Sequence, residues 1–151
     1  MIRDDIKAAT IAAMKGGDKE TTATLRLASA AIKNRDIEAR TGGAPRDDDA
    51  LVTEVLQKMI KQRRESAELY RKGGREDRAA AEEEEIAVIE RFLPKQLSDA
   101  EAEAKIREIV AETGASSMKD MGRVMALVKV RLGTSIDPAR ASRLVKAALG
   151  S

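Results

Sequence analysis

Positively charged side chains recur at helical spacing near the end of this chain, and they are its best candidates for binding chemistry. Arg140, Arg143 and Lys146 follow one another every three residues, and Lys119 and Arg123 lie four residues apart. Positions three or four apart share one face of an α-helix. Because such cations bind phosphate, we predict these five residues as RNA contacts. The alternative is that they form an ordinary solvated helix face.

The net charge of +2 hides an uneven distribution. Residues 1–96 hold 19 basic and 19 acidic side chains, whereas residues 114–151 hold seven Lys and Arg against two Asp. This surplus favours phosphate as a ligand. Tyr70 and Phe92 are the only aromatic residues, so recognition by base stacking is not expected. We therefore expect any RNA to be bound by its shape and its phosphates.

Residue types that usually carry catalysis are absent. The chain has no His and no Cys, which removes the usual general base, the commonest metal ligand, thiolate nucleophiles and disulfides. It also has no glycine-rich phosphate loop and no dinucleotide fingerprint. We predict no catalytic residue, no metal and no cofactor, and we expect the protein not to be an enzyme.

Two weaker patterns have simpler explanations. Ser116 and Ser117, followed by Lys119, resemble the serine and lysine chemistry of amidases, but a nucleophile also needs a base and an oxyanion hole. Ser117 as a helix N-cap explains the same residues. The four glutamates at 82–85 surround a helix instead of converging on one ion, which favours a solvated acidic face over a metal site.

Helices must position all of these residues, because every periodic segment has helical spacing and none alternates as a half-buried strand does. The predicted helices cover residues 2–15, 19–40, 47–72, 75–93, 98–113, 117–132 and 137–149. The last two each have an apolar stripe, formed by Met121, Val124, Met125, Val128 and Leu132 and by Ala141, Leu144, Val145 and Ala148. The basic third helix should pair antiparallel with the acidic fourth.

Start and stop signals divide the chain into two parts. Pro94 ends the fourth helix, and Ser98 with Glu101 forms a capping box that opens the fifth. Asp137 before Pro138 opens the last helix. We predict an all-α protein with an N-terminal four-helix domain at residues 1–94 and a C-terminal three-helix domain at residues 95–151.

Three sequence blocks resemble the YqeY-like family. They are residues 55–66 (VLQKMIKQRRES), residues 85–98 (EIAVIERFLPKQLS) and residues 120–125 (DMGRVM). In the last block Arg123 stands where the family often has Lys, which keeps the charge. The resemblance covers nearly the whole chain, and the blocks follow the expected order.

The resemblance implies a function linked to tRNA. The family shares its helical region with the C-terminal part of GatB, the transfer subunit of the glutamine-dependent amidotransferase that corrects misacylated Glu-tRNA(Gln) and Asp-tRNA(Asn). In GatB that helical tail is understood to contact tRNA, while amide transfer takes place in a separate domain. The resemblance thus implies a tRNA-associated module. A carbon–nitrogen ligase label, with glutamine as amido donor, would be inherited from GatB.

Partners and location follow as further expectations. The partner is expected to be tRNA or another structured RNA; the alternative is an adaptor that docks on an amidotransferase or an aminoacyl-tRNA synthetase. The amino-terminal residues lack the apolar run of a signal peptide, and no segment approaches the length of a membrane span. We therefore expect a cytoplasmic protein without membrane contact.

Overall fold

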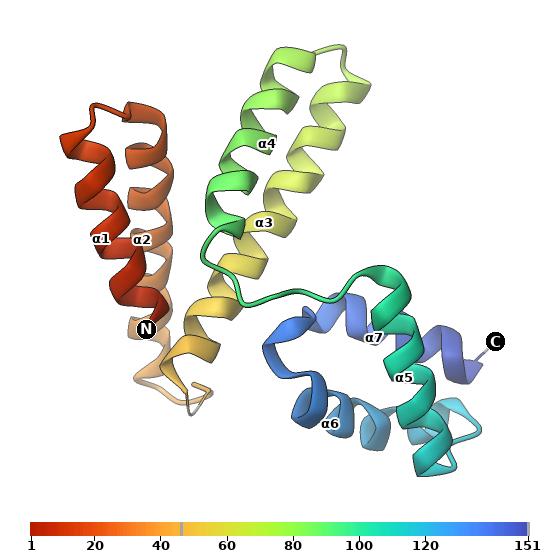
Figure 1. The fold of residues 1–151 in the computed structure, drawn as a ribbon. Helices are drawn as coiled ribbons and strands as arrows, with labels where there is room; N and C mark the ends of the chain where they lie inside the picture. Colours follow the sequence, from red (N-terminus) through yellow and green to blue (C-terminus); the bar gives the residue numbers. More distant parts are fainter. Residues whose placement is uncertain (46, 151) are drawn as a thin grey trace. The chain divides into compact units, whose positions relative to one another are not determined.

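The computed structural model describes residues 1–45 and 47–150, and all regular structure in them is helical, as predicted (Figure 1). The α-helices are α1 (Ile2–Lys15), α2 (Lys19–Ala39), α3 (Asp48–Lys72), α4 (Glu76–Glu90), α5 (Asp99–Thr113), α6 (Met121–Leu132) and α7 (Pro138–Gly150). Two short 3₁₀ helices, η1 (Met118–Asp120) and η2 (Gly133–Ser135), flank α6. The chain divides into two compact units, Met1–Leu93 and Pro94–Ser151, each with its own apolar core.

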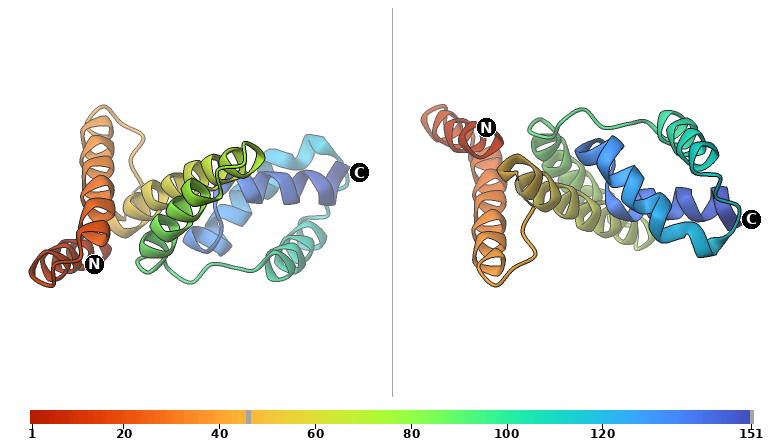
Figure 2. Two further views of the ribbon diagram at one scale, coloured as in Figure 1. Left: turned by 90° about the horizontal axis from the view of Figure 1, so that it is seen from above. Right: turned by 90° about the horizontal axis from the view of Figure 1, so that it is seen from below.

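The first unit consists of two helical hairpins, α1–α2 and α3–α4 (Figure 1). Gly17 and Gly74 form the two turns with positive φ angles of 73° and 75°, which glycine adopts without a steric penalty. The further views in Figure 2 agree that α3 and α4 lie along each other. Leu25 from α2, Leu56 from α3 and Ile89 from α4 are almost completely buried where the hairpins meet.

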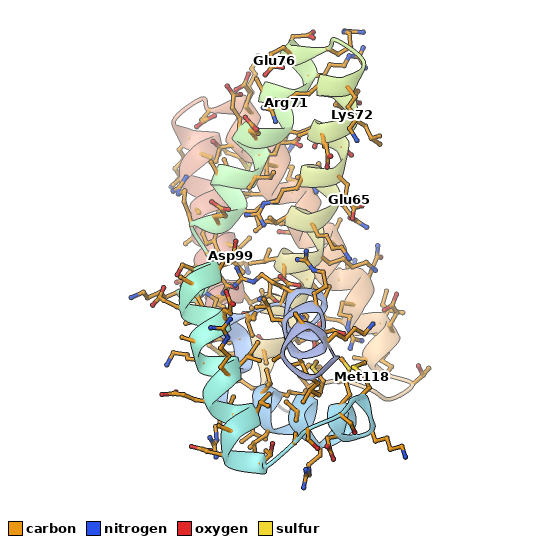
Figure 3. All side chains as sticks on the ribbon, turned by 90° about the vertical axis from the view of Figure 1, so that its right-hand side faces the viewer. Glu65, Arg71, Lys72, Glu76, Asp99 and Met118 are labelled. Atoms are coloured by element: carbon orange, nitrogen blue, oxygen red, sulfur yellow. The ribbon has the colours of Figure 1, made fainter. Side chains whose placement is uncertain are left out.

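Ion pairs join α3 to α4, which confirms the predicted antiparallel pairing of a basic and an acidic helix. Arg63 Nε lies 3.1 Å from Glu85 Oε2, and the arginine side chain is only 14% exposed. Near the tip of the hairpin, Arg71 Nε lies 3.0 Å from Glu76 Oε1 (Figure 3). Glu85 and Glu83, two of the four glutamates at residues 82–85, therefore contribute to the packing of the hairpin, since Glu83 pairs with Arg71.

The fourth helix is shorter than predicted, because α4 ends at Glu90 instead of Leu93. The N–H groups of Phe92 and Leu93 bond to the carbonyl oxygens three residues earlier, at Ile89 and Glu90. Such tightening of a last turn uses carbonyl groups that an α-helix leaves unpaired. Phe92 and Leu93 are then half-buried against the core of the first unit.

Arg3 fastens α1 to the rest of the first unit, which the sequence pattern did not predict. Its guanidinium donates two hydrogen bonds to Asp36 of α2, at 2.8 and 2.9 Å, and two to Asp48 of α3, at 2.8 and 3.2 Å. The backbone N–H of Ile2 adds a bond to Asp49 Oδ1 at 2.9 Å. These bonds hold the first turn of α1 against two other helices.

In the second unit, α5, α6 and α7 pack against one another around a core of small aliphatic side chains. The predicted capping box is present: Ser98 Oγ accepts a bond from the Glu101 N–H at 3.2 Å, and Glu101 accepts one from the Ser98 N–H at 3.1 Å. Gly114 ends α5 in the left-handed conformation, with φ of 67°. The side chains with at most 2% exposure are Ala102, Ile106, Ile109, Val124, Val128 and Val145.

Two details of the second unit differ from prediction. Ser117 caps a single 3₁₀ turn by accepting a bond from the Lys119 N–H, and α6 begins only at Met121. In α7 the buried row is Ala141, Val145 and Leu149, whereas Ala148 is exposed. Because a helix has 3.6 residues per turn, residues four apart lie nearly above one another. The buried row therefore continues from Val145 to Leu149 and does not include Ala148.

The segment between α4 and α5 is bonded to the second unit. The Leu97 N–H donates to the Ser135 carbonyl oxygen at 2.8 Å. The Gln96 side-chain amide donates to the carbonyl oxygens of Thr134 and Pro94, both at 2.8 Å. Residues 94–98 therefore form an ordered edge of that unit. In the described part of the chain, no helix is long and apolar enough to cross a membrane.

Candidate nucleic-acid interface

Arg143 and Lys146 lie on the solvent side of α7. Both side chains are exposed, while Ala141 and Val145 of the same helix are buried in the core. No carboxylate within the described residues forms an ion pair with either cation. Both charges therefore face solvent without a carboxylate partner in the described part of the chain.

Arg140 does not share that exposed surface, although the spacing groups it with the other two. Its guanidinium donates to the Leu97 carbonyl oxygen at 2.7 Å and to Asp99 Oδ1 at 3.1 Å, and its side chain is only 20% exposed. Asp99 lies at the first turn of α5 (Figure 3). The buried Nε atom of Arg140 has no hydrogen-bond partner among the residues that the structure describes. Arg140 thus ties α7 to the start of α5, and its charge is already neutralised.

Lys119 and Arg123 differ from each other in the same way. Lys119 is exposed in η1 and forms no ion pair within the described residues. Arg123 Nη2 lies 3.2 Å from Asp120 Oδ1, which places the guanidinium beside the carboxylate of the preceding turn. The arginine side chain is still 58% exposed, so this pair is weak and a stronger anion can displace it.

Lys129 of α6 is another exposed cation, and the repeated spacing of the other basic residues did not point to it. It is exposed and has no ion-pair partner in the described part of the chain. The neighbouring Arg131 pairs with Glu112 of α5. The sequence signal for Lys129 was the charge count itself, because residues 114–151 contain more cations than their two aspartates can neutralise.

The two aspartates of residues 114–151 accept hydrogen bonds from nearby groups of the chain. Asp120 accepts bonds from the Ser116 N–H at 3.1 Å and from Arg123. Asp137 caps α7 by accepting the Arg140 N–H at 2.8 Å. Within the described residues, neither aspartate forms an ion pair with the remaining cations, which are Lys119, Lys129, Arg143 and Lys146. We call these four residues the uncompensated cations.

The serines and glutamates that the sequence offered as catalytic or metal-binding candidates have other roles or environments in the structure. Ser117 acts as a cap, and the Ser116 N–H is bonded to Asp120. Burial raises the pKa of Glu82, and the nearby Glu85 carboxylate raises it further. Within the described residues, no cluster of three or more acidic side chains has the geometry to hold a metal ion.

The sequence of the chain matches a known protein family over nearly its whole length. The model of the family described as "Yqey-like protein" matches residues 3–149. The chain belongs to the YqeY-like protein family. This confirms the resemblance carried by the three sequence blocks, and it extends over both units of the chain.

Three curated relatives are similar to this YqeY-like chain over about three quarters or more of its length. The protein named "Altered inheritance of mitochondria protein 41, mitochondrial" is 34% identical over 113 residues in Lachancea thermotolerans and 30% identical over 127 residues in Vanderwaltozyma polyspora. The Eremothecium gossypii protein of the same name is 33% identical over 120 residues. These matches cover 74%, 80% and 76% of this chain, but only 57%, 64% and 62% of the relatives' own lengths.

The names of these relatives correct one expectation. Three of them are called mitochondrial, which conflicts with the prediction of a cytoplasmic protein, and that prediction was wrong. The cytoplasmic prediction rested on the lack of a signal-peptide-like apolar run and of a segment as long as a membrane span. A mitochondrial protein needs neither of these features, so the composition could not separate the two compartments.

Proposed function

We propose that this YqeY-like chain is a non-catalytic helical module that binds tRNA or another structured RNA through α6, α7 and η1. The observation that carries the proposal is the set of uncompensated cations. Phosphate oxygens are the anions that would neutralise them, and each contact would release a condensed counterion. The similarity of the family to the helical tail of GatB points to the same class of ligand.

The composition of the second unit decides how the RNA would be held. Both aromatic residues of the chain, Tyr70 and Phe92, precede this unit, so it has no ring on which a base could stack. Arg and Lys side chains remain, and these contact the backbone. Binding should therefore follow the fold of the RNA and depend little on its sequence.

Filter binding of bulk tRNA at several salt concentrations tests this proposal. The proposal predicts binding that weakens steeply with salt and is competed by any folded tRNA. Poly(U), which is single-stranded and unstructured, should compete poorly. Absence of binding at low salt would contradict the proposal, and so would an affinity that does not change with salt, as expected for an adaptor that docks on a protein.

A further inference from the structure

A second row of side chains follows α2 on the side that faces away from the core. The core side of this helix buries Leu25, Ala28 and Ile32. The second row is exposed, and its residues are spaced alternately by four and three positions. We call this row the α2 seam; it consists of Ala23, Leu27, Ala30, Asn34 and Ile37.

The spacing of the α2 seam is that of a coiled-coil interface. Steps of four and three residues keep side chains in one narrow stripe, where they can insert between side chains of a second helix. Leu27 and Ile37 are 51% and 48% exposed, and the seam contains no charged residue. Asn34 supplies one polar position, which in paired helices selects the register. A helix face meant only for solvent would instead be charged or polar throughout.

Basic residues line one border of the seam at intervals of seven. This basic border consists of Lys19, Arg26, Lys33 and Arg40. All four are exposed, and in the described part of the chain none forms an ion pair with a carboxylate. The Arg26 guanidinium lies 3.6 Å from the sulfur of Met14, which holds it at the side of the helix. The seam is therefore apolar along its centre and positive along one edge.

The charges on the border discriminate between possible occupants. A second copy of α2 in antiparallel orientation would bring the two basic borders together, and a parallel copy would offer them one carboxylate, Glu38. An RNA backbone would neutralise the border but would gain nothing from Leu27 and Ile37. An acidic amphipathic helix satisfies both features, because its apolar stripe covers the seam and its carboxylates face the border.

We propose that the α2 seam is the docking site for an amphipathic helix of a partner protein, with apolar residues at the same four-and-three spacing and Asp or Glu beside them. This site lies in the first unit, and it does not depend on the RNA proposal for the second. Loss of RNA binding would leave this proposal intact, and loss of helix binding would leave the RNA proposal intact.

Two designed peptides serve as probes. The acidic probe is a fluorescein-labelled four-heptad helix with Leu at both stripe positions and Glu beside them, and the basic probe has Lys in place of Glu. Fluorescence anisotropy with the full chain should show binding of the acidic probe and little binding of the basic one. The double variant Leu27→Ser/Ile37→Ser should bind the acidic probe roughly tenfold or more weakly. The control is Leu69→Ser, because Leu69 is an exposed leucine on α3.

A charge-reversal variant tests the border without touching the apolar stripe. Lys19→Glu/Lys33→Glu leaves Arg26 and Arg40 in place and makes the border neutral overall. The preference for the acidic probe should therefore be lost, so that the two probes bind about equally. The proposal is overturned if the wild type binds neither probe or binds both equally, or if the Ser double variant binds like the wild type. It is also overturned if light scattering shows a wild-type dimer that the Ser double variant dissociates, because the occupant is then a second copy.

Discussion

Arg140 of α7 donates a 2.7 Å hydrogen bond to the carbonyl oxygen of Leu97, across 43 residues of sequence. Leu97 directly precedes Ser98, which is the N-cap of α5. The bond therefore joins α7, the last helix of the second unit, to the start of α5, the first helix of that unit. The same guanidinium reaches Asp99. Arg140 therefore stabilises the fold, whereas Arg143, three residues later, is exposed.

This difference predicts that substitutions of the two arginines change the free energy of unfolding by unequal amounts. Arg140→Ala should lower the free energy of unfolding by about 1–3 kcal/mol, because it leaves the Leu97 carbonyl without its donor. Arg143→Ala should change it by less than about 0.5 kcal/mol. Urea unfolding of both variants, followed by circular dichroism, measures the two values. If Arg140→Ala changes the free energy of unfolding as little as Arg143→Ala does, the bonds of Arg140 contribute nothing to stability.

The sequence could not distinguish these arginines, although it located their helix correctly. Helix periodicity depends on neighbours three and four residues away, and it revealed α7 and the buried positions Ala141 and Val145 on its core face. The partners of Arg140 lie on α5 and on the segment before it, and no local pattern reports them. The Ser98 capping box was predictable for the opposite reason, because both of its residues lie within one helical turn.

The second unit should fold alone. A fragment of residues 94–151 retains the bonds of Gln96 and Leu97 to the η2 turn and the bond of Gln96 to the Pro94 carbonyl oxygen. We therefore expect a cooperative thermal transition by circular dichroism. A fragment that begins at residue 98 loses these bonds and should be less stable. A gradual melt of the longer fragment would show that the core of the unit depends on the first 93 residues.

Arg3 should give the first unit a specific dependence on acid. Its hydrogen bonds hold the pKa of Asp36 below the usual value. The contact therefore stabilises the folded state fully at pH values above the unfolded pKa of about 4. This stabilisation is lost as the pH falls through the lower pKa of Asp36 in the folded state. Arg3→Ala should cost about 1 kcal/mol at pH 7, since both partners are partly exposed.

The measurement for Arg3 is urea unfolding of wild type and variant at several pH values from 7 down to about 2.5. The stability difference should shrink toward the acid end, because a protonated Asp36 no longer attracts the guanidinium. A difference that stays constant over that range would show that Arg3 acts through packing alone. The matched control is Lys7→Ala, which removes an exposed positive charge from the same helix.

The purified protein should neither hydrolyse glutamine nor transfer its amide to Glu-tRNA(Gln). The chain lacks His and Cys, and Ser117 serves as a cap for η1. Ammonia release and amide formation are the measurements. Turnover that survives rigorous purification and disappears in Ser116→Ala/Ser117→Ala would refute this expectation. Turnover that persists in that variant would also refute it, and would direct the search to other residues.

The salt dependence of tRNA binding by a variant of α7 tests the central claim most directly. Arg143→Ala/Lys146→Ala removes two uncompensated cations, and each lost phosphate contact should reduce the slope of log K against log salt by roughly 0.7–0.9. The control Lys105→Ala/Arg107→Ala removes two charges from α5, where Arg107 is paired with Glu103. The proposal predicts a shallower slope for the α7 variant and a nearly unchanged slope for the control. Identical slopes for wild type and the α7 variant would contradict it.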